Sequence, residues 1–69
     1  MNVYMAVTAD ELELPLIVAD SASELGRILG RTRGDIFSML SRKSVSLTTF
    51  NGYRYRIIKV DIDEEDDNG

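Results

Sequence analysis

Apolar and polar residues alternate with a period of two near the start of the chain. Residues 3–8 and 12–18 are rich in apolar and β-branched side chains and are separated by three residues, which predicts an N-terminal β-hairpin. Pro15 has no backbone N–H to donate, so we expect the second strand at an edge of the sheet. The alternation of residues 12–18 puts Leu12, Leu14, Leu16 and Val18 on one face of this strand.

From Ser21 onward the apolar period changes to about 3.6 residues. Ser21 and Glu24 have the spacing of a capping box, and Gly30 provides a left-handed end, so a helix of about nine residues is predicted between them. Its apolar stripe consists of Ala22, Leu25, Ile28 and Leu29.

Thr32 and Asp35 repeat the capping-box pattern directly afterwards, which predicts a second helix ending at about Arg42. Gly34 in its first turn costs up to about 1 kcal/mol relative to alanine, which indicates close approach of another group to the backbone. The expected buried stripe is Ile36, Met39 and Leu40. The expected outward positions are Arg33, Gly34, Phe37, Ser38, Ser41 and Arg42.

A second hairpin is predicted near the end of the chain, because residues 45–50 and 53–62 flank the type I′ turn signal Asn51-Gly52. The apolar phase shifts at Ile57, which indicates either a bulge or a strand buried on both faces. The predicted fold is therefore α+β, with an N-terminal β-hairpin, a helix pair and a C-terminal β-hairpin. The strands of both hairpins form one small antiparallel sheet on which the helices pack.

The distribution of charge divides the chain into a domain, residues 1–62, and an acidic tail, residues 63–69, whose composition predicts disorder. The net charge is −4, but five of the twelve acids lie in the tail. All eight basic residues lie between Arg27 and Lys59, where Asp35 is the sole acid, giving that window a charge of +7. The chain is thus electrically polarised.

Several classes of function are disfavoured by composition. With no cysteine and no histidine, the chain has no disulfide, no usual zinc ligands and neither the common general base nor a thiol nucleophile. We therefore expect no enzyme active site, no metal and no cofactor. The longest apolar run, residues 14–19, is far shorter than the roughly 20 residues that cross a bilayer, and no leader pattern is present. We expect a cytoplasmic protein that does not enter a membrane.

The spacing of six residues within 22–43 is that of the apolar and small positions of a helix-turn-helix, namely Leu25, Gly26, Leu29, Gly30, Ile36 and Met39. This third of the chain resembles helix-turn-helix DNA-binding domains. It is also similar to the small modular domains of phage and mobile-element proteins, such as nuclease-associated modular domains. Arg31 departs from the pattern, since a buried valine or isoleucine is usual there, and Gly26 replaces the commoner alanine.

The resemblance implies a protein that binds double-stranded DNA, in a regulatory or accessory role, with its second helix in the major groove. Arg33, Asp35, Phe37 and Ser38 would face the groove, Arg42 and Lys43 would lie near the backbone, and Arg27 and Arg31 would contact phosphates. The second hairpin would act as a basic wing through Arg54, Arg56 and Lys59. A homodimer would place two such helices on two half-sites.

Three alternatives stay open at this point. The chain is also compatible with a phage-type interaction module or inhibitor that presents acids where a nucleic-acid-handling protein expects phosphates. Its contacting residues would be Asp10, Glu11, Glu13, Asp20 and the tail. A second alternative is an acidic tail that covers the basic face until DNA displaces it. A third is a scaffold that dimerises through an exposed sheet edge.

Overall fold

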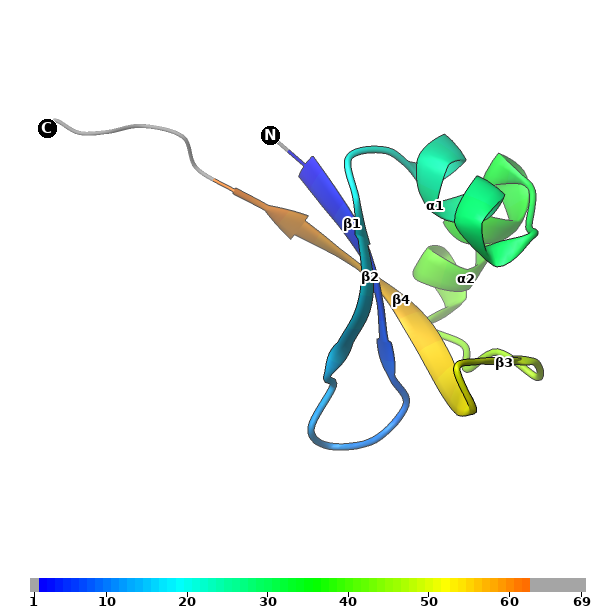
Figure 1. Cartoon of the computed structure of the whole chain (residues 1–69). Coiled ribbons are helices and arrows are strands. Elements are labelled where there is room, and N and C mark those ends of the chain that lie inside the picture. Colours follow the sequence, from blue (N-terminus) through cyan, green and yellow to red (C-terminus); the bar gives the residue numbers. More distant parts are fainter. Residues whose placement is uncertain (1, 63–69) are drawn as a thin grey trace, which may run out of the picture.

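The four strands form one antiparallel sheet in the order β2-β1-β4-β3, and both helices lie on one side of it (Figure 1). This arrangement comes from a computed structural model, in which residues 2–62 of the 69 are described. The elements are β1 (Asn2–Thr8), β2 (Pro15–Ala19), α1 (Ala22–Leu29), α2 (Arg33–Arg42), β3 (Thr49–Phe50) and β4 (Tyr53–Asp61). The predicted α+β class, with a hairpin on either side of the helix pair, is confirmed. The predicted acidic tail lies outside the described residues.

Both helices begin at the predicted N-caps, and α1 ends at the predicted Gly30. The Ser21 hydroxyl accepts a hydrogen bond from the Glu24 amide, and the Thr32 hydroxyl accepts one from the Asp35 amide, both at 3.1 Å. Each cap satisfies one of the backbone donors that a helix N-terminus leaves without an intrahelical partner. Gly30 ends α1 in the left-handed region, with φ of 74°.

The connection between the helices is tight at Gly26. Its carbonyl accepts from the Arg31 amide at 2.7 Å, and a Cβ built on Gly26 would lie only 2.5 Å from the Arg31 carbonyl oxygen. A side chain at this position would collide with backbone. Glycine is therefore required where the last turn of α1 meets the chain that leads into α2.

The core lies between the helix pair and the sheet. Leu25 of α1 and Ile36 of α2 are fully buried, against Ala6 of β1 and against Tyr55 and Ile57 of β4. Burying a leucine or isoleucine side chain stabilises a fold by about 1.5–3 kcal/mol, so this cluster fixes the helix pair on the two central strands. Ile28 was expected in the apolar stripe of α1. It lies outside the core instead, with 43% of its surface exposed.

The four side chains predicted on one face of β2 do not stay together, because Leu16 packs against the core and the other three are exposed. Leu12, Leu14 and Val18 are 71%, 52% and 59% exposed, whereas Ile17 and Ala19 enter the core. The strand begins only at Pro15, and Val7 pairs with Pro15 while Ala6 pairs with Ile17, so that Leu16 is an extra residue. This bulge reverses the side-chain phase that simple alternation predicts. The edge position of the strand is confirmed.

The C-terminal hairpin has the predicted turn, with positive φ at Asn51 and Gly52. Its long strand, β4, pairs with β1 over seven residues without a shift, so the bulge considered for β4 is absent there and lies in the first hairpin instead. The other strand is shorter than the predicted 45–50. The Ser46 amide bonds to the Tyr55 carbonyl, while its hydroxyl accepts from the Thr48 amide, and this local bonding replaces regular pairing.

Candidate nucleic-acid interface

The outward face of α2 is exposed along its whole length. All six residues expected to face outward are exposed, while Ile36 and Met39 on the opposite side are buried. At 100° per residue, Gly34, Ser38 and Ser41 follow the middle of this face, with Arg33 on one flank and Arg42 on the other. The face is therefore low in the middle over a length of about 15 Å, with Arg33 on one flank and, on the other, Arg42 next to the exposed Asp35.

Phe37 lies at the border of this face rather than in the core. Phe37 is 39% exposed. Its ring packs edge-to-face with the ring of Tyr4 of β1, with 6.1 Å between the ring centroids. The Arg33 guanidinium lies over the Phe37 ring, 5.4 Å from the centroid. Such a contact contributes about 0.5–1 kcal/mol at an exposed site. It holds the arginine on the outward face and leaves its N–H groups available for a ligand.

The packing around Gly34 within the protein does not require a glycine. The nearest atom to a Cβ built there is the Thr32 hydroxyl at 3.9 Å, an ordinary contact distance. An alanine would fit and would favour the helix by up to about 1 kcal/mol. The protein's own packing therefore does not account for this residue, in contrast to Gly26.

Arg31 points into the protein. Its Nε donates to the Tyr55 hydroxyl at 2.8 Å, and its terminal nitrogen donates to the hydroxyls of Ser46 and Thr48 at 2.7 and 3.3 Å. Ser46 and Tyr55 are only 3% and 1% exposed. The guanidinium thus joins the turn between the helices to the second hairpin. Its donors are therefore engaged within the fold and are not presented at the surface of α2.

The same cluster affects Tyr55. Burial raises the pKa of its hydroxyl, but hydrogen bonds with Arg31, Ser46 and Thr48 and the positive charge of Arg31 together lower that pKa below 10.0. Nothing in the spacing around Arg31 marks these partners. The one signal in the sequence is that Ser46 and Thr48 are hydroxyl residues at alternate positions. Their proximity to Tyr55 comes from strand pairing and is not visible in the sequence.

The two arginines predicted to form a wing lie away from α2. Because Tyr55 and Ile57 face the helices, the alternating positions Arg54 and Arg56 lie on the opposite face of the sheet. Arg56 forms an ion pair with Glu13 at 2.7 Å and donates to the Asp10 carbonyl at 3.4 Å. Arg54 is exposed. The structure therefore separates both residues from the helix face that they were expected to extend.

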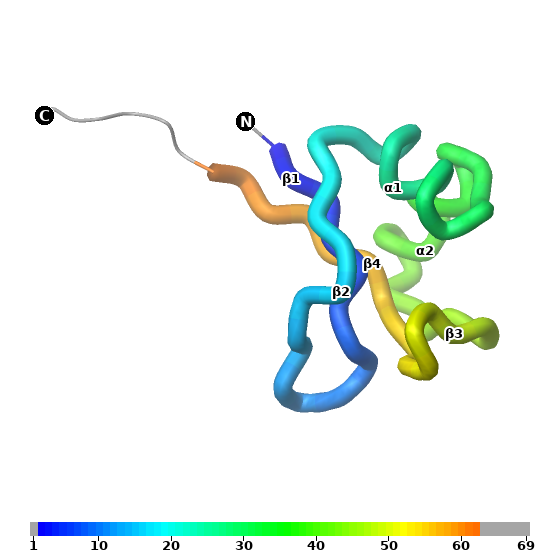
Figure 2. Tube along the Cα trace, viewed as in Figure 1, coloured from blue at the N-terminus to red at the C-terminus, as the bar shows by residue number. Residues whose placement is uncertain are grey.

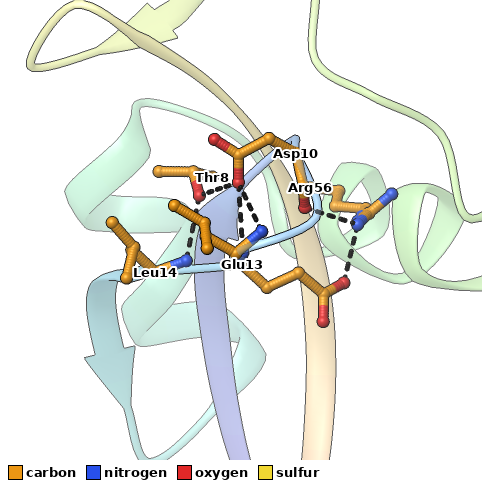
Figure 3. A network of polar contacts seen from close by, with 6 residues as sticks. Thr8, Asp10, Glu13, Leu14 and Arg56 are labelled. Atoms are coloured by element: carbon orange, nitrogen blue, oxygen red, sulfur yellow. Dashed lines mark hydrogen bonds and ion pairs between the residues drawn. The ribbon is translucent and has the colours of Figure 1, made fainter.

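The Arg56 contacts are part of an ordered loop between β1 and β2, which extends from one end of the sheet (Figures 2 and 3). One Asp10 carboxylate oxygen accepts from the Thr8 hydroxyl and from the amides of Leu12 and Glu13. The Thr8 hydrogen bond contributes most to lowering the Asp10 pKa below 3.8, with the two amides and Arg56 adding to it against a smaller opposing effect of burial. Two of the acids assigned to an acidic recognition surface are thus used to build this loop.

The other two basic residues predicted to contact DNA, Arg27 and Lys43, lie outside the outward face of α2. Arg27 lies on the exposed side of α1 and pairs with Glu24 at 2.7 Å, and this bond raises the pKa of Arg27. Lys43 caps α2 in the left-handed region, with φ of 54°. It lines a cavity of about 550 Å³ beside β4, together with Leu40 and Lys59. Of the eight predicted residues, Ser38 lies in the middle of the outward face of α2, and Arg33 and Arg42 lie on its two flanks.

Within residues 2–62 no group of three or more acidic, cysteine or histidine side chains lies close enough to hold a metal ion. In the same range no helix has the length and apolar character needed to span a membrane. Comparisons with family models, with curated proteins and with solved structures give no match.

Proposed function

We propose that this protein binds double-stranded DNA through the outward face of α2, with α1 and the Arg31 cluster holding that helix in place. The observation that carries the proposal is that Arg33 and Arg42 flank, on opposite sides, an exposed helix face whose middle is made of small residues, Ser38 among them. A major groove admits a helix, and small side chains let phosphates and base edges approach its backbone.

The roles of the three residues follow from their chemistry. A guanidinium donates two parallel hydrogen bonds to guanine, or to a phosphate, and Arg33 lies in the first turn, the part of a recognition helix that reaches the bases. Ser38, one turn later, has a hydroxyl that bonds to donors or acceptors alike. Arg42 in the last turn neutralises the DNA backbone, with Arg27 of α1 adding a second, weaker phosphate contact because Glu24 competes for it.

A titration of a labelled random duplex, followed by fluorescence anisotropy, tests the proposal. With about three phosphates neutralised, the logarithm of affinity should fall with the logarithm of salt with a slope of about −3 between about 50 and 200 mM salt. The double variant Arg33→Ala/Arg42→Ala should bind at least about 10-fold more weakly, since each such contact contributes about 1–3 kcal/mol.

Arg54→Ala is the matched control. It removes the same charge from an exposed position on the opposite face of the sheet, so its affinity should stay within about twofold of the unaltered protein. Circular dichroism of all variants checks that they remain folded. If the unaltered protein does not bind at low salt, or if Arg54→Ala weakens binding as much as the double variant, the proposal is contradicted.

A second function, binding to another protein, is favoured by the loop between β1 and β2. Hydrogen bonds from two amides to Asp10 order this loop. The loop nevertheless presents Leu12 and Leu14, which are 71% and 52% exposed, and Glu11 lies directly before Leu12. Ordered exposed leucines are typical of interaction sites. The Arg33→Ala/Arg42→Ala variant distinguishes the two functions, because it removes DNA binding and leaves this loop unchanged.

A further inference from the structure

Arg33 and Phe37 form one continuous feature on the first half of α2. They are four residues apart, so their side chains lie side by side on one flank of the helix, and the Arg33 guanidinium lies 5.4 Å from the centroid of the Phe37 ring. Arg31 also lies over a ring, that of Tyr55, but both of those groups are engaged inside the fold. Among residues 2–62, the contact between Arg33 and Phe37 is therefore the arginine–aromatic contact that is open to a ligand.

The Phe37 ring is held in place but remains partly open. The ring of Tyr4 packs against it edge-to-face, and 39% of Phe37 is exposed. At 100° per residue, Phe37 lies about 40° from Arg33 and about 40° from Ser41, between the flank and the middle of the outward face. A duplex lying along this face would meet the ring as well as the guanidinium.

The surroundings of Arg33 and Phe37 leave room for such a contact. Both residues line a cavity of about 470 Å³. Asp20 lines the same cavity, yet neither it nor another acid of residues 2–62 forms an ion pair with Arg33. The guanidinium is thus positioned by the ring and keeps its N–H groups for a partner outside the protein.

The two side chains match two different groups in a major groove. A guanidinium donates two parallel hydrogen bonds to the acceptors of guanine, whereas an aromatic ring packs against the methyl group of thymine, the one apolar group that the four ordinary bases present there. Groups in contact with one another reach the same base pair or neighbouring ones, because base pairs stack about 3.4 Å apart. The same pair is excluded, since guanine pairs with cytosine, which has no methyl group. The thymine must therefore belong to the adjoining pair.

We propose that Arg33 and Phe37 together recognise a two-base-pair element of DNA, in which Arg33 binds a guanine and Phe37 packs on the methyl group of a thymine in the adjoining pair. Such recognition rests on the proposed DNA binding and gives the sequence element that the outward face of α2 selects. Gly34 favours it, because the absence of a side chain beside Arg33 lets the edge of the groove approach the helix.

The other flank of α2 has no comparable pair of side chains. Arg42 lies next to the exposed Asp35, and no aromatic ring lies beneath the Arg42 guanidinium in the described part of the chain. A guanidinium without such support is free to follow the phosphates, which carry no direct information on base sequence. Selection between sequences therefore belongs to the Arg33 flank.

A set of labelled duplexes of about 16 base pairs, roughly one and a half turns, tests the element by fluorescence anisotropy at about 50 mM salt. The TG duplex has alternating thymine and guanine in one strand and alternating cytosine and adenine in the other. The UG duplex is identical except that deoxyuridine replaces thymine, which removes only the methyl groups. In another duplex 7-deazaguanine replaces guanine and removes one of its two acceptors. The last, of alternating guanine and cytosine, keeps guanine but has no thymine.

The unaltered protein should bind the TG duplex about fourfold more tightly than the UG duplex, which is the ratio expected for burying one methyl group. The duplex of guanine and cytosine should bind within about twofold of the UG duplex, since both offer guanine without a methyl group. 7-Deazaguanine should weaken binding at least about threefold, because Arg33 loses one of its two acceptors.

Phe37→Ala should reduce the ratio between the TG and UG duplexes from about fourfold to about one, because the ring and the methyl group act as a pair. Tyr53→Ala is the matched control. It removes a ring that is 55% exposed beside the turn of the second hairpin, and it should keep the fourfold ratio. Circular dichroism checks the fold, and a general loss of structure would weaken binding to both duplexes alike.

The outcomes separate this element from DNA binding itself. If the TG and UG duplexes bind equally while Arg33→Ala/Arg42→Ala still weakens binding, the two-base-pair element is wrong and the proposed function stands. If none of the duplexes binds, both are contradicted. A ratio that persists in Phe37→Ala would overturn the role of the ring.

Discussion

The junction around Arg31 and the outward face of α2 combine the same kinds of side chain, arginine and hydroxyl residues, in two different ways. At the junction, Arg31 donates to three hydroxyls, two of them on buried residues. On α2, Arg33 has only an aromatic ring beneath it, and Ser38 and Ser41 are exposed. The first arrangement uses the donors of arginine to hold the fold, and the second presents them to solvent.

A basic stretch of sequence is therefore not in itself a binding surface, because some of its arginines are used inside the fold. The fold uses Arg31 itself at a position where the helix-turn-helix pattern predicts an apolar side chain, since the guanidinium reaches across to β4 and donates to Ser46 and Tyr55. Arg56 has a similar role at the β1–β2 loop. Removing a junction arginine should therefore change stability, whereas removing an outward arginine should change binding.

The largest effect is expected for Arg31→Ala. It removes three hydrogen bonds, including the one from the guanidinium to the buried Tyr55 hydroxyl, which should lower the free energy of unfolding by about 2–3 kcal/mol. Urea denaturation measures the loss. Arg31→Lys should recover only part of it, because an ammonium group lacks the fork that reaches Tyr55 and Ser46 together. A stable variant that no longer binds DNA would reverse the roles assigned to Arg31 and Arg33.

Gly26→Ala should come next, with a loss of about 1–3 kcal/mol, because its Cβ would lie 2.5 Å from the Arg31 carbonyl oxygen and backbone must move. Thermal unfolding followed by circular dichroism gives the measurement. An unchanged midpoint would mean that the junction is looser than its geometry indicates.

Gly34→Ala is the counterpart on the outward face, with an effect of opposite sign. It should raise the free energy of unfolding by up to about 1 kcal/mol, because the new methyl group has room and alanine favours the helix. DNA affinity should fall at the same time, since the methyl group occupies the middle of the proposed contact surface. Denaturation and anisotropy titrations on the same preparation separate the two effects; a variant that gains both stability and affinity would contradict close approach at Gly34.

The smallest effect is expected at Asp10, as a change with pH. Its pKa is lowered in the folded protein, so its carboxylate contributes stability that is present above the ordinary value of 3.8 and is lost as pH falls through the lowered value. Asp10→Asn should reduce the pH dependence of unfolding in that acid range. Amide exchange at Leu12 and Glu13 is the local readout, and equal exchange in both proteins would show that Asp10 does not order the loop.

The elements governed by local chemistry could be predicted from the sequence. Ser21, Thr32 and Gly30 predict both helices, and Asn51-Gly52 predicts the second turn, because caps and turns depend on neighbouring residues. The face of β2 could not be predicted, since the extra residue at Leu16 appears only when the strand is paired with β1. The first strand of the second hairpin is short for a related reason, because Ser46 bonds to a residue nine positions away.

The candidate site divides in the same way. The exposed positions of α2 follow from helical periodicity, so Ser38 could be placed in the middle of the outward face, and Arg33 and Arg42 on its flanks, from the sequence. The partners of Arg31 and Arg56 could not, because Tyr55 and Glu13 come within reach only through the pairing of distant strands. Which arginines are used internally is therefore a property of the tertiary structure.

The central claim, that DNA contacts the outward face of α2 while the Arg31 junction stays internal, is tested most directly by an NMR titration of the ¹⁵N-labelled protein with a short duplex at low salt. We predict that the largest amide shifts occur at Gly34, Ser38 and Ser41, with little change at Ser46 and Tyr55. Largest shifts in the loop at residues 10–14, or no shifts at all, would contradict the account.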